Sequence, residues 1–262
     1  MSSPIVTSPR KPVVVVTGAS KGIGLAVARL LLTTFGARVV ALSRSKTPEL
    51  NNLASDDLLF LPCDVSNETA LTEAINRAEQ AFDHIDGLVL NAGILDPLGN
   101  IGDDTQLSAW KHHFDVNFFS LVTALKAALP ALRKSDFGGK VVFVSSGAAV
   151  KGAAGWGPYS AGKAAMNSLC RTLAEEEPSI VSVALRPGMV DTGMQSTLRS
   201  NEGSLLPQKE HQKFVSAHAE GKLVKPEDAG HVIAALALRG QKELSGKFVS
   251  WDSEECKTYR HE

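Results

Sequence analysis

Short apolar runs recur along the chain and are separated by segments with helical periodicity. The run PVVVVTG at 12–18 has no charged position, carries four valines and ends in a glycine, which is typical of a strand buried on both faces of a parallel sheet. Six similar runs bring the number of predicted strands to seven, at 37–42, 58–63, 86–90, 140–145, 180–185 and 246–250.

Five segments between these runs place apolar residues at helical spacing: 22–35, 68–82, 107–132, 160–177 and 226–238. Strand and helix alternate, and this order is typical of right-handed crossovers that build one doubly wound sheet. We therefore predict a single α/β domain over 12–250, with a seven-stranded parallel sheet and helices on both faces. Residues 1–11 are expected to be a flexible arm, and 251–262 a C-terminal tail.

The longest irregular stretch runs from Gly188 to about Lys225. Its first part is rich in Gly, Ser and Thr, and it continues into an amphipathic segment at 209–221. A connection of this length inside a compact domain is usually functional. We expect the loop at about 189–225 to close over a substrate.

Composition narrows the classes of partner. The net charge is −1, with 27 basic and 28 acidic residues, which argues against a nucleic-acid or anionic-membrane surface. No signal-peptide pattern and no 18-residue apolar run stand out, so no membrane partner is expected and the cytoplasm is the predicted location. Cys63, Cys170 and Cys256 are too widely spaced for a CxxC pair, and the seven histidines suggest no metal site.

A glycine-rich turn follows the first predicted strand. In TGASKGIG, the residues Gly18, Gly22 and Gly24 lie between a buried strand and a helix. Glycines there let backbone N–H groups approach a pyrophosphate at the helix N-terminus, where the helix dipole favours negative charge. The turn predicts a dinucleotide site, and a purely structural turn is the weaker alternative.

The end of the second strand bears on the choice of cofactor. An acid there would bind the ribose 2′-hydroxyl, but the segment 39–45 has none. Arg44, with Ser43 and Lys21, offers positive charge and donors to a 2′-phosphate instead. This pattern predicts NADP(H) rather than NAD(H), unless Arg44 is only a solvated surface residue.

Tyr159 and Lys163 are one helical turn apart, so they share a helix face. A pair at this spacing arises by chance in roughly one such sequence in eight, so the pair alone decides little. Reduction of a carbonyl develops negative charge on oxygen, and a tyrosine with its ordinary pKa can supply the proton. Lys163 is expected to bring the pKa of Tyr159 toward neutrality, because a nearby ammonium favours the tyrosinate that the reverse reaction needs. Ser145 and Ser146 end the fifth strand, and alternation points only one of their hydroxyls to the site.

Seven motifs in order resemble the short-chain dehydrogenase/reductases: TGASKGIG, CDV, NAG at 91–93, FDVNFFS, VSSGAA, Tyr159 to Lys163, and RPGMVDT. The resemblance covers roughly 12–250 and implies a Rossmann-type NADP(H)-binding domain. Within the family, the sequence is most similar to NADPH-dependent carbonyl reductases of the sepiapterin reductase and fungal benzil reductase type.

The resemblance implies roles for individual residues. Catalysis falls to Asn117, Ser146, Tyr159 and Lys163, with Ser146 chosen because it precedes Tyr159 by thirteen positions and Asn117 holding a water in a proton relay. The cofactor contacts are Gly18, Ser20, Lys21, Gly22, Ile23, Gly24, Ser43, Arg44, Asp64, Val65, Asn91, Ala92, Gly93, Tyr159, Lys163, Pro187, Gly188, Val190 and Thr192. The substrate contacts are Ser146, Trp156, Tyr159 and Met189.

Structural roles compete with several of these assignments. Asp64 and Thr192 could be helix caps, 91–93 a plain turn, Asn117 a satisfied helix amide and Trp156 a core residue. We nevertheless expect NADPH-dependent reduction of a small-molecule ketone or diketone by a homodimer or homotetramer. The alternatives are an alcohol dehydrogenase that runs the reverse reaction, and a non-catalytic NADP(H)-binding sensor.

Overall fold

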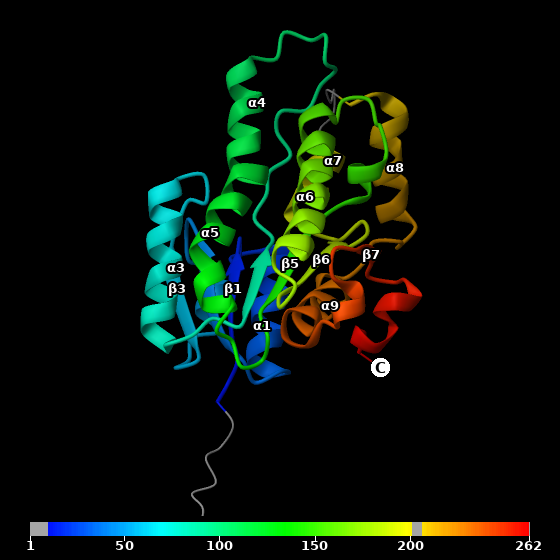
Figure 1. Cartoon of the computed structure of the whole chain (residues 1–262). Helices are drawn as coiled ribbons and strands as arrows, with labels where there is room; N and C mark the ends of the chain where they lie inside the picture. The colour runs from blue at the N-terminus through cyan, green and yellow to red at the C-terminus, as the bar shows by residue number, and fades with distance from the viewer. Residues whose placement is uncertain (1–9, 201–205, 262) are drawn as a thin grey trace, which may run out of the picture.

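A seven-stranded, all-parallel sheet forms the centre of the computed structural model, which describes residues 10–200 and 206–261 (Figure 1). The strand order is β3-β2-β1-β4-β5-β6-β7, which confirms the predicted doubly wound α/β fold. The strands are β1 (Val13–Thr17), β2 (Arg38–Ser43), β3 (Leu58–Pro62), β4 (Gly87–Leu90), β5 (Lys140–Val144), β6 (Val181–Arg186) and β7 (Phe248–Ser250).

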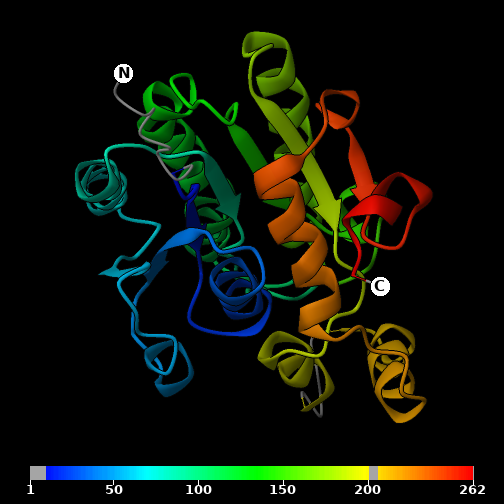
Figure 2. The same cartoon turned by 90° about the horizontal axis from the view of Figure 1, so that it is seen from below.

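Helices cover both faces of this sheet (Figure 2). They are α1 (Gly22–Thr33), α2 (Pro48–Asn51), α3 (Glu68–Phe82), α4 (Leu107–Phe114), α5 (Ser120–Leu132), α6 (Gly157–Glu176), α7 (Gly193–Ser200), α8 (Gln208–Ala219) and α9 (Pro226–Arg239). Val14 and Val16 of β1 pack toward α1 and α9, whereas Val13 and Val15 pack toward α3, α5 and α6. Both faces of β1 are therefore buried, which explains its unbroken valine run.

The long helix predicted at 107–132 is interrupted. A single π-helical turn at Asp115–Phe119 separates α4 from α5. Such turns occur often at functional sites, and this one contains Asn117. The apolar periodicity of the sequence predicts a helix here, but it does not indicate that the turn at Asp115–Phe119 contains an extra residue.

The stretch at 188–225 is more regular than predicted. It contains α7, which the irregular Gly- and Ser-rich pattern did not predict, and α8, which matches the amphipathic segment. Gln195 and Leu198 are the buried residues of α7, so tertiary packing supports a helix of low intrinsic propensity. Both helices lie above the carboxyl end of the sheet (Figure 1), and the expected loop residues 201–205 lie outside the described part.

The segment after β7 packs against α9 and does not extend into solvent. Cys256 and Tyr259 are buried, and the Tyr259 backbone oxygen lies 2.8 Å from Nδ1 of His231. The expected arm at 1–11 lies outside the described residues except for its last two, Arg10 and Lys11.

The helical stretch Leu107–Leu132 is long and apolar enough to cross a membrane by length and composition, contrary to the expectation that no such segment exists. Half of its most apolar window is buried inside the protein. A core helix passes the same test, so the stretch is weak support for a membrane span.

Asp86, directly before β4, joins three parts of the chain. Its carboxylate accepts two hydrogen bonds from Arg10, one from the Val13 amide and one from Ser135. Burial raises the pKa of Asp86, but these hydrogen bonds outweigh burial and hold the pKa below its ordinary value. The charged form therefore stabilises the fold.

We predict that Asp86→Asn lowers the free energy of unfolding by about 2–3 kcal/mol, because charge-assisted hydrogen bonds are lost. The contribution of Asp86 is complete above about pH 4 and decreases as the pH falls through its lower folded-state pKa. Urea denaturation between pH 7 and 3 measures both effects. Asp136→Asn, at an exposed carboxylate 3.5 Å from Arg10, is the control and should cost less than about 0.5 kcal/mol.

Candidate active site

A cavity of about 750 Å³ lies at the carboxyl end of the sheet, where the strand order reverses between β1 and β4. Ligands of doubly wound sheets bind at this point. The structure brings every sequence-predicted site residue to the cavity wall except Gly24 and Asn117, which lie behind it.

The glycine turn has the backbone that a phosphate needs. Gly18 and Gly22 have positive φ angles of 66° and 55°, and a Cβ atom on Gly24 would lie 2.3 Å from the Gly18 oxygen. The N-cap residue of α1, Lys21, makes no side-chain capping bond. The first N–H groups of α1 are thus left for an anion, so the turn fits the pyrophosphate of a dinucleotide.

Two cations border the part of the cavity beyond β2. Arg44 and Lys21 are exposed, and neither forms an ion pair with any residue that the structure describes. Ser43 also lines the cavity, and its hydroxyl donates to the Ser45 oxygen at 2.9 Å. Arg44 and Lys21 therefore carry the positive charge available for a 2′-phosphate.

Asp64 does not cap a helix. The N-cap of α3 is Asn67, whose side chain accepts from the Ala70 amide. Asp64 accepts from the amide and the hydroxyl of Ser66, and these bonds lower its pKa. The carboxylate is thus held charged at the cavity wall, beside Val65.

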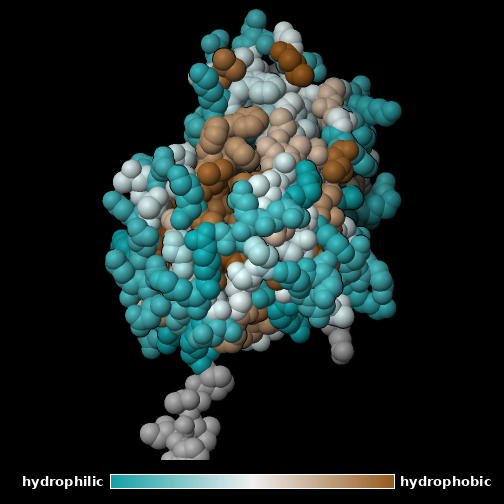
Figure 3. All heavy atoms as spheres, viewed as in Figure 1, coloured by the Kyte–Doolittle hydropathy of each residue, from teal (hydrophilic) through white to brown (hydrophobic). Residues whose placement is uncertain are grey.

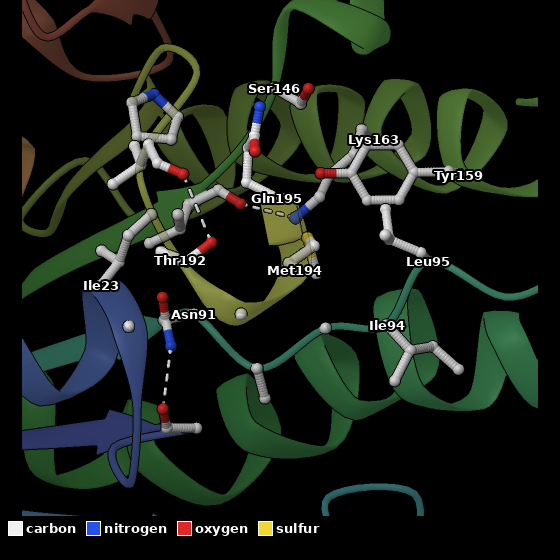
Figure 4. Close-up of a pocket in the computed structure, with 18 of the residues that line it drawn as sticks. Ile23, Asn91, Ile94, Leu95, Ser146, Tyr159, Lys163, Thr192, Met194 and Gln195 are labelled. Carbon is white, nitrogen blue, oxygen red and sulfur yellow. Dashed lines mark hydrogen bonds between the residues drawn. The ribbon is translucent and has the colours of Figure 1, made fainter. Parts of the chain in front are cut away.

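Asn91 ties the turn after β4 to the turn after β1 (Figure 4). Its Nδ2 donates to the backbone oxygens of Thr17 and Gly18 at 2.9 and 3.2 Å. The Thr17 hydroxyl accepts in return from the amides of Asn91 and Ala92. The two turns that would hold the cofactor are therefore one hydrogen-bonded unit.

Ser146, Tyr159 and Lys163 converge at the other end of the cavity (Figure 4). Both Ser145 and Ser146 line the cavity, but the Ser145 hydroxyl donates to Oδ1 of Asn167 at 2.6 Å. Ser146 accepts from the Ala148 amide at 3.1 Å and forms a hydrogen bond with Tyr159, which favours Ser146 as the serine of the site. Helix α6 begins at Gly157, two residues before Tyr159 and earlier than predicted.

Burial shifts the pKa values of Tyr159 and Lys163 in the direction that favours the neutral form of each side chain. Burial raises the pKa of Tyr159, and a hydrogen bond with Ser146 acts in the opposite direction. Burial also lowers the pKa of Lys163 to about 8, and its ammonium donates to the Val144 oxygen at 2.6 Å. Burial is the largest influence on the pKa of Tyr159 in this arrangement, and the role of Lys163 in lowering that pKa stays a prediction.

Asn117 is fully buried behind the cavity wall. Its Oδ1 accepts from the Ile94 amide at 2.8 Å, and its Nδ2 donates to the Ile94 oxygen at 2.9 Å. Nδ2 also lies 2.8 Å from Nε2 of His113. Both N–H bonds of this amide are used within the protein, so the expected water relay cannot use them.

The contact with Asn117 fixes the state of His113. Nε2 faces an N–H donor and must accept, so Nδ1 carries the proton and donates to the Asp96 oxygen at 2.7 Å. Burial lowers the pKa of His113, in agreement with a neutral ring. Sequence analysis missed this residue, although its spacing of four from Asn117 on a helix was a usable signal.

An aromatic wall closes the cavity beside Tyr159. The Trp156 ring centroid lies 5.5 Å from that of Tyr159 and 5.6 Å from that of Phe214 in α8. Trp156 and Met189 line the cavity as predicted, but Phe214 and Gln195 were missed. No spacing rule indicates that α7 and α8 lie over α6.

Comparison with known proteins agrees with this geometry. A family model described as short chain dehydrogenase matches residues 12–203, which is most of the chain. The protein belongs to the short-chain dehydrogenase family. Members of this family are oxidoreductases that use a nicotinamide cofactor, NAD or NADP.

Other members of the short-chain dehydrogenase family resemble the chain over nearly its whole length. An uncharacterized oxidoreductase of Schizosaccharomyces pombe is 41% identical over 92% of this chain and 96% of its own. Benzil reductase ((S)-benzoin forming) of Saccharomyces cerevisiae is 32% identical over the same shares. The crystal structure of a short chain dehydrogenase/reductase from S. cerevisiae superimposes with a TM-score of 0.91 at 33% identity, covering 95% of this chain and 100% of that one.

We predict that His113→Leu lowers the free energy of unfolding by about 1–2 kcal/mol at pH 8, because one Asn117 N–H loses its acceptor. The stability that neutral His113 provides is complete above about pH 6.5 and decreases as the pH falls toward its lower folded-state pKa. The difference in the free energy of unfolding between parent and variant, measured by urea denaturation, should therefore become smaller toward pH 5. His112→Leu changes the exposed neighbouring histidine and is the control. Its free energy of unfolding should differ little from that of the parent, and the difference should not become smaller toward pH 5.

Proposed function

We propose that the protein is an NADPH-dependent carbonyl reductase that converts a ketone or diketone to a secondary alcohol. The observation that carries this proposal is the convergence of Ser146, Tyr159 and Lys163 at one end of a cavity whose other end offers the glycine turn. The similarity to a benzil reductase supports a carbonyl substrate. A non-catalytic sensor would have no need for these three side chains in one place.

The preference for NADPH rests on charge. Arg44 and Lys21 are cations at the cavity wall that form no ion pair with the residues described in the structure, and the end of β2 carries no acid to bind a ribose 2′-hydroxyl. The uncapped N-terminus of α1 would bind the pyrophosphate, and Val190 and Thr192 line the part of the cavity suited to the nicotinamide amide. NADPH supplies the hydride when bound.

The protein's own groups would stabilise and protonate the carbonyl oxygen. Ser146 and Tyr159 donate hydrogen bonds to that oxygen, where negative charge develops, and the Tyr159 hydroxyl transfers its proton. The Tyr159 hydroxyl is protonated at neutral pH, as a proton donor must be, and burial raises its pKa further. The Lys163 ammonium places a positive charge near the Tyr159 hydroxyl and can bind the ribose of the cofactor. Asn117 fixes the backbone of Ile94 in the cavity wall through two hydrogen bonds.

The substrate half of the cavity favours an aromatic or otherwise apolar ketone, since Trp156, Phe214 and Leu95 line it. Apolar side chains also gather on the surface over α4, α5 and α6 (Figure 3). Leu107 at the start of α4 and Phe119 directly before α5 are exposed. This surface supports a homodimer or homotetramer formed through these helices. The proposed location is the cytoplasm.

Tyr159→Phe tests the proton donor. The variant should lower kcat/KM for ketone reduction by about 10²–10⁴-fold, because the acid is lost while the ring stays. The Kd for NADPH, measured by fluorescence titration, should change by no more than a few-fold. Tyr259→Phe changes the other tyrosine, which does not line the cavity, and is the matched control. Near-normal turnover by Tyr159→Phe would refute the assignment.

Arg44→Ala tests the cofactor. The parent should prefer NADPH to NADH, and the variant should lose about 10–100-fold in kcat/KM for NADPH with little change for NADH, because only the 2′-phosphate loses its partner. Lys46→Ala is the control, since Lys46 is exposed nearby but does not line the cavity. A parent that prefers NADH would contradict the proposal.

A further inference from the structure

A cationic side chain, Arg186, borders the cavity next to the strand end that carries the site serine. Arg186 is the last residue of β6, is exposed and lines the cavity. Strands β5 and β6 pair in parallel with Val144 opposite Leu185, and the Ser145 amide donates to the Leu185 oxygen at 2.8 Å. This register places Arg186 beside the two serines that directly follow β5.

The guanidinium group of Arg186 lies against the backbone that follows Ser146. A Cβ atom on Gly147 would lie 3.2 Å from Nε of Arg186 and 3.5 Å from its Cζ. A side chain at position 147 would therefore press against Arg186, and glycine leaves the guanidinium this position. Gly147 directly follows Ser146, which forms a hydrogen bond with Tyr159. The positive charge thus lies one residue along the chain from a group proposed to hold the carbonyl oxygen.

The donors of Arg186 are free to bind a ligand. Within residues 10–200 and 206–261, the Arg186 side chain forms no hydrogen bond and no ion pair. An arginine on an open surface is usually just solvated, but this one borders a binding cavity and can be reached from it. A planar guanidinium binds a carboxylate through two parallel hydrogen bonds, so a carboxylate is the partner that it fits best.

The charges around the cavity favour an anion at Arg186. Among the described residues that line the cavity, the carboxylates are Asp64 and Glu210. Asp64 lies at the end proposed for the cofactor, and Glu210 forms an ion pair with Lys213. Arg186 has no such counter-charge, and the exposed Lys151 adds a second cation to the lining. A positive potential of this kind attracts an anionic substrate and repels none of its negative charge.

We propose that Arg186 binds a carboxylate of the substrate, so that the protein reduces oxo acids, which carry a ketone and a carboxylate in one molecule. This inference rests on the proposed reductase function, with the ketone oxygen at Ser146 and Tyr159. The apolar body of the substrate lies along Trp156 and Phe214, which line the cavity. A substrate held at both its ketone oxygen and its carboxylate presents one face of the ketone to the nicotinamide.

Oxo acids and their methyl esters test the role of the charge, because each ester keeps the ketone and the ring of its acid. Phenylglyoxylate carries the carboxylate next to the ketone, and β-benzoylpropionate carries it two methylene groups away. The measurement is kcat/KM for NADPH oxidation with both acids and both esters at low ionic strength, in the parent and in Arg186→Gln. Dividing each variant value by the parent value removes the different intrinsic reactivities of the four ketones.

Arg186→Gln should lower kcat/KM about tenfold for the oxo acids and less than about twofold for the esters, because only the acids lose a charge-assisted hydrogen bond. Arg186→Lys keeps the charge without the planar fork and should restore part of the loss. Arg171→Gln removes an exposed arginine that does not line the cavity and is the matched control. It should leave the ratio of acid to ester unchanged.

Binding tests the carboxylate site without turnover. In titration calorimetry of the protein loaded with NADP⁺, the Kd for the oxo acids should be about tenfold higher in Arg186→Gln than in the parent. The Kd for NADPH should change by no more than a few-fold. The thermal unfolding temperature shows that each variant is folded.

An equal effect of Arg186→Gln on acids and esters overturns the carboxylate site. A Kd for NADPH that rises about tenfold in the same variant also overturns it, since Arg186 would then bind the cofactor. A parent that binds NADPH but reduces none of the four ketones overturns the proposed function, and the calorimetry still decides the carboxylate site. The two failures are thus separate.

Discussion

The site depends on the hydrogen-bonded contact between the turn after β1 and the turn after β4. A Cβ atom on Gly18 would lie 2.9 Å from the Ala92 Cα, so only a glycine lets the two backbones come this close without a shift. Asn91 and Thr17 then join the turns through four hydrogen bonds. Without this approach, the crevice at the strand reversal would have no fixed wall on its β4 side.

Residues 94–96 follow this contact directly along the chain and form the wall against which the reacting groups are positioned. Asn117 holds Ile94 from behind, and His113 holds both the Asn117 amide and the Asp96 oxygen. The same His113 ring lies 6.2 Å from the Tyr159 ring, so the elements that carry wall and acid are packed together. Buried polar groups with complete hydrogen bonding fix one arrangement, because any shift leaves one of them unpaired.

The sequence predicted the parts of the molecule that follow from local pattern. Unbroken valine runs indicated the central strands, and glycines between strand and helix located the dinucleotide turn. Helix α7 was not predicted, because its Gly, Ser and Thr residues favour a loop and only the packing of Gln195 and Leu198 reverses that preference. Phe214 and Gln195 were missed for a related reason: contacts between α6, α7 and α8 depend on tertiary packing, which leaves no periodicity in the chain.

The π-helical turn at Asp115–Phe119 has a consequence for the whole helix. An extra residue in one turn rotates everything beyond it by roughly 100° relative to a regular helix. Helix α4 can thus turn His113 toward the site while α5 turns Leu121 and Leu125 toward the sheet. The helical stretch Leu107–Leu132 thereby presents side chains to the cavity from α4 and to the hydrophobic core from α5, which a regular helix of the same sequence would not do together.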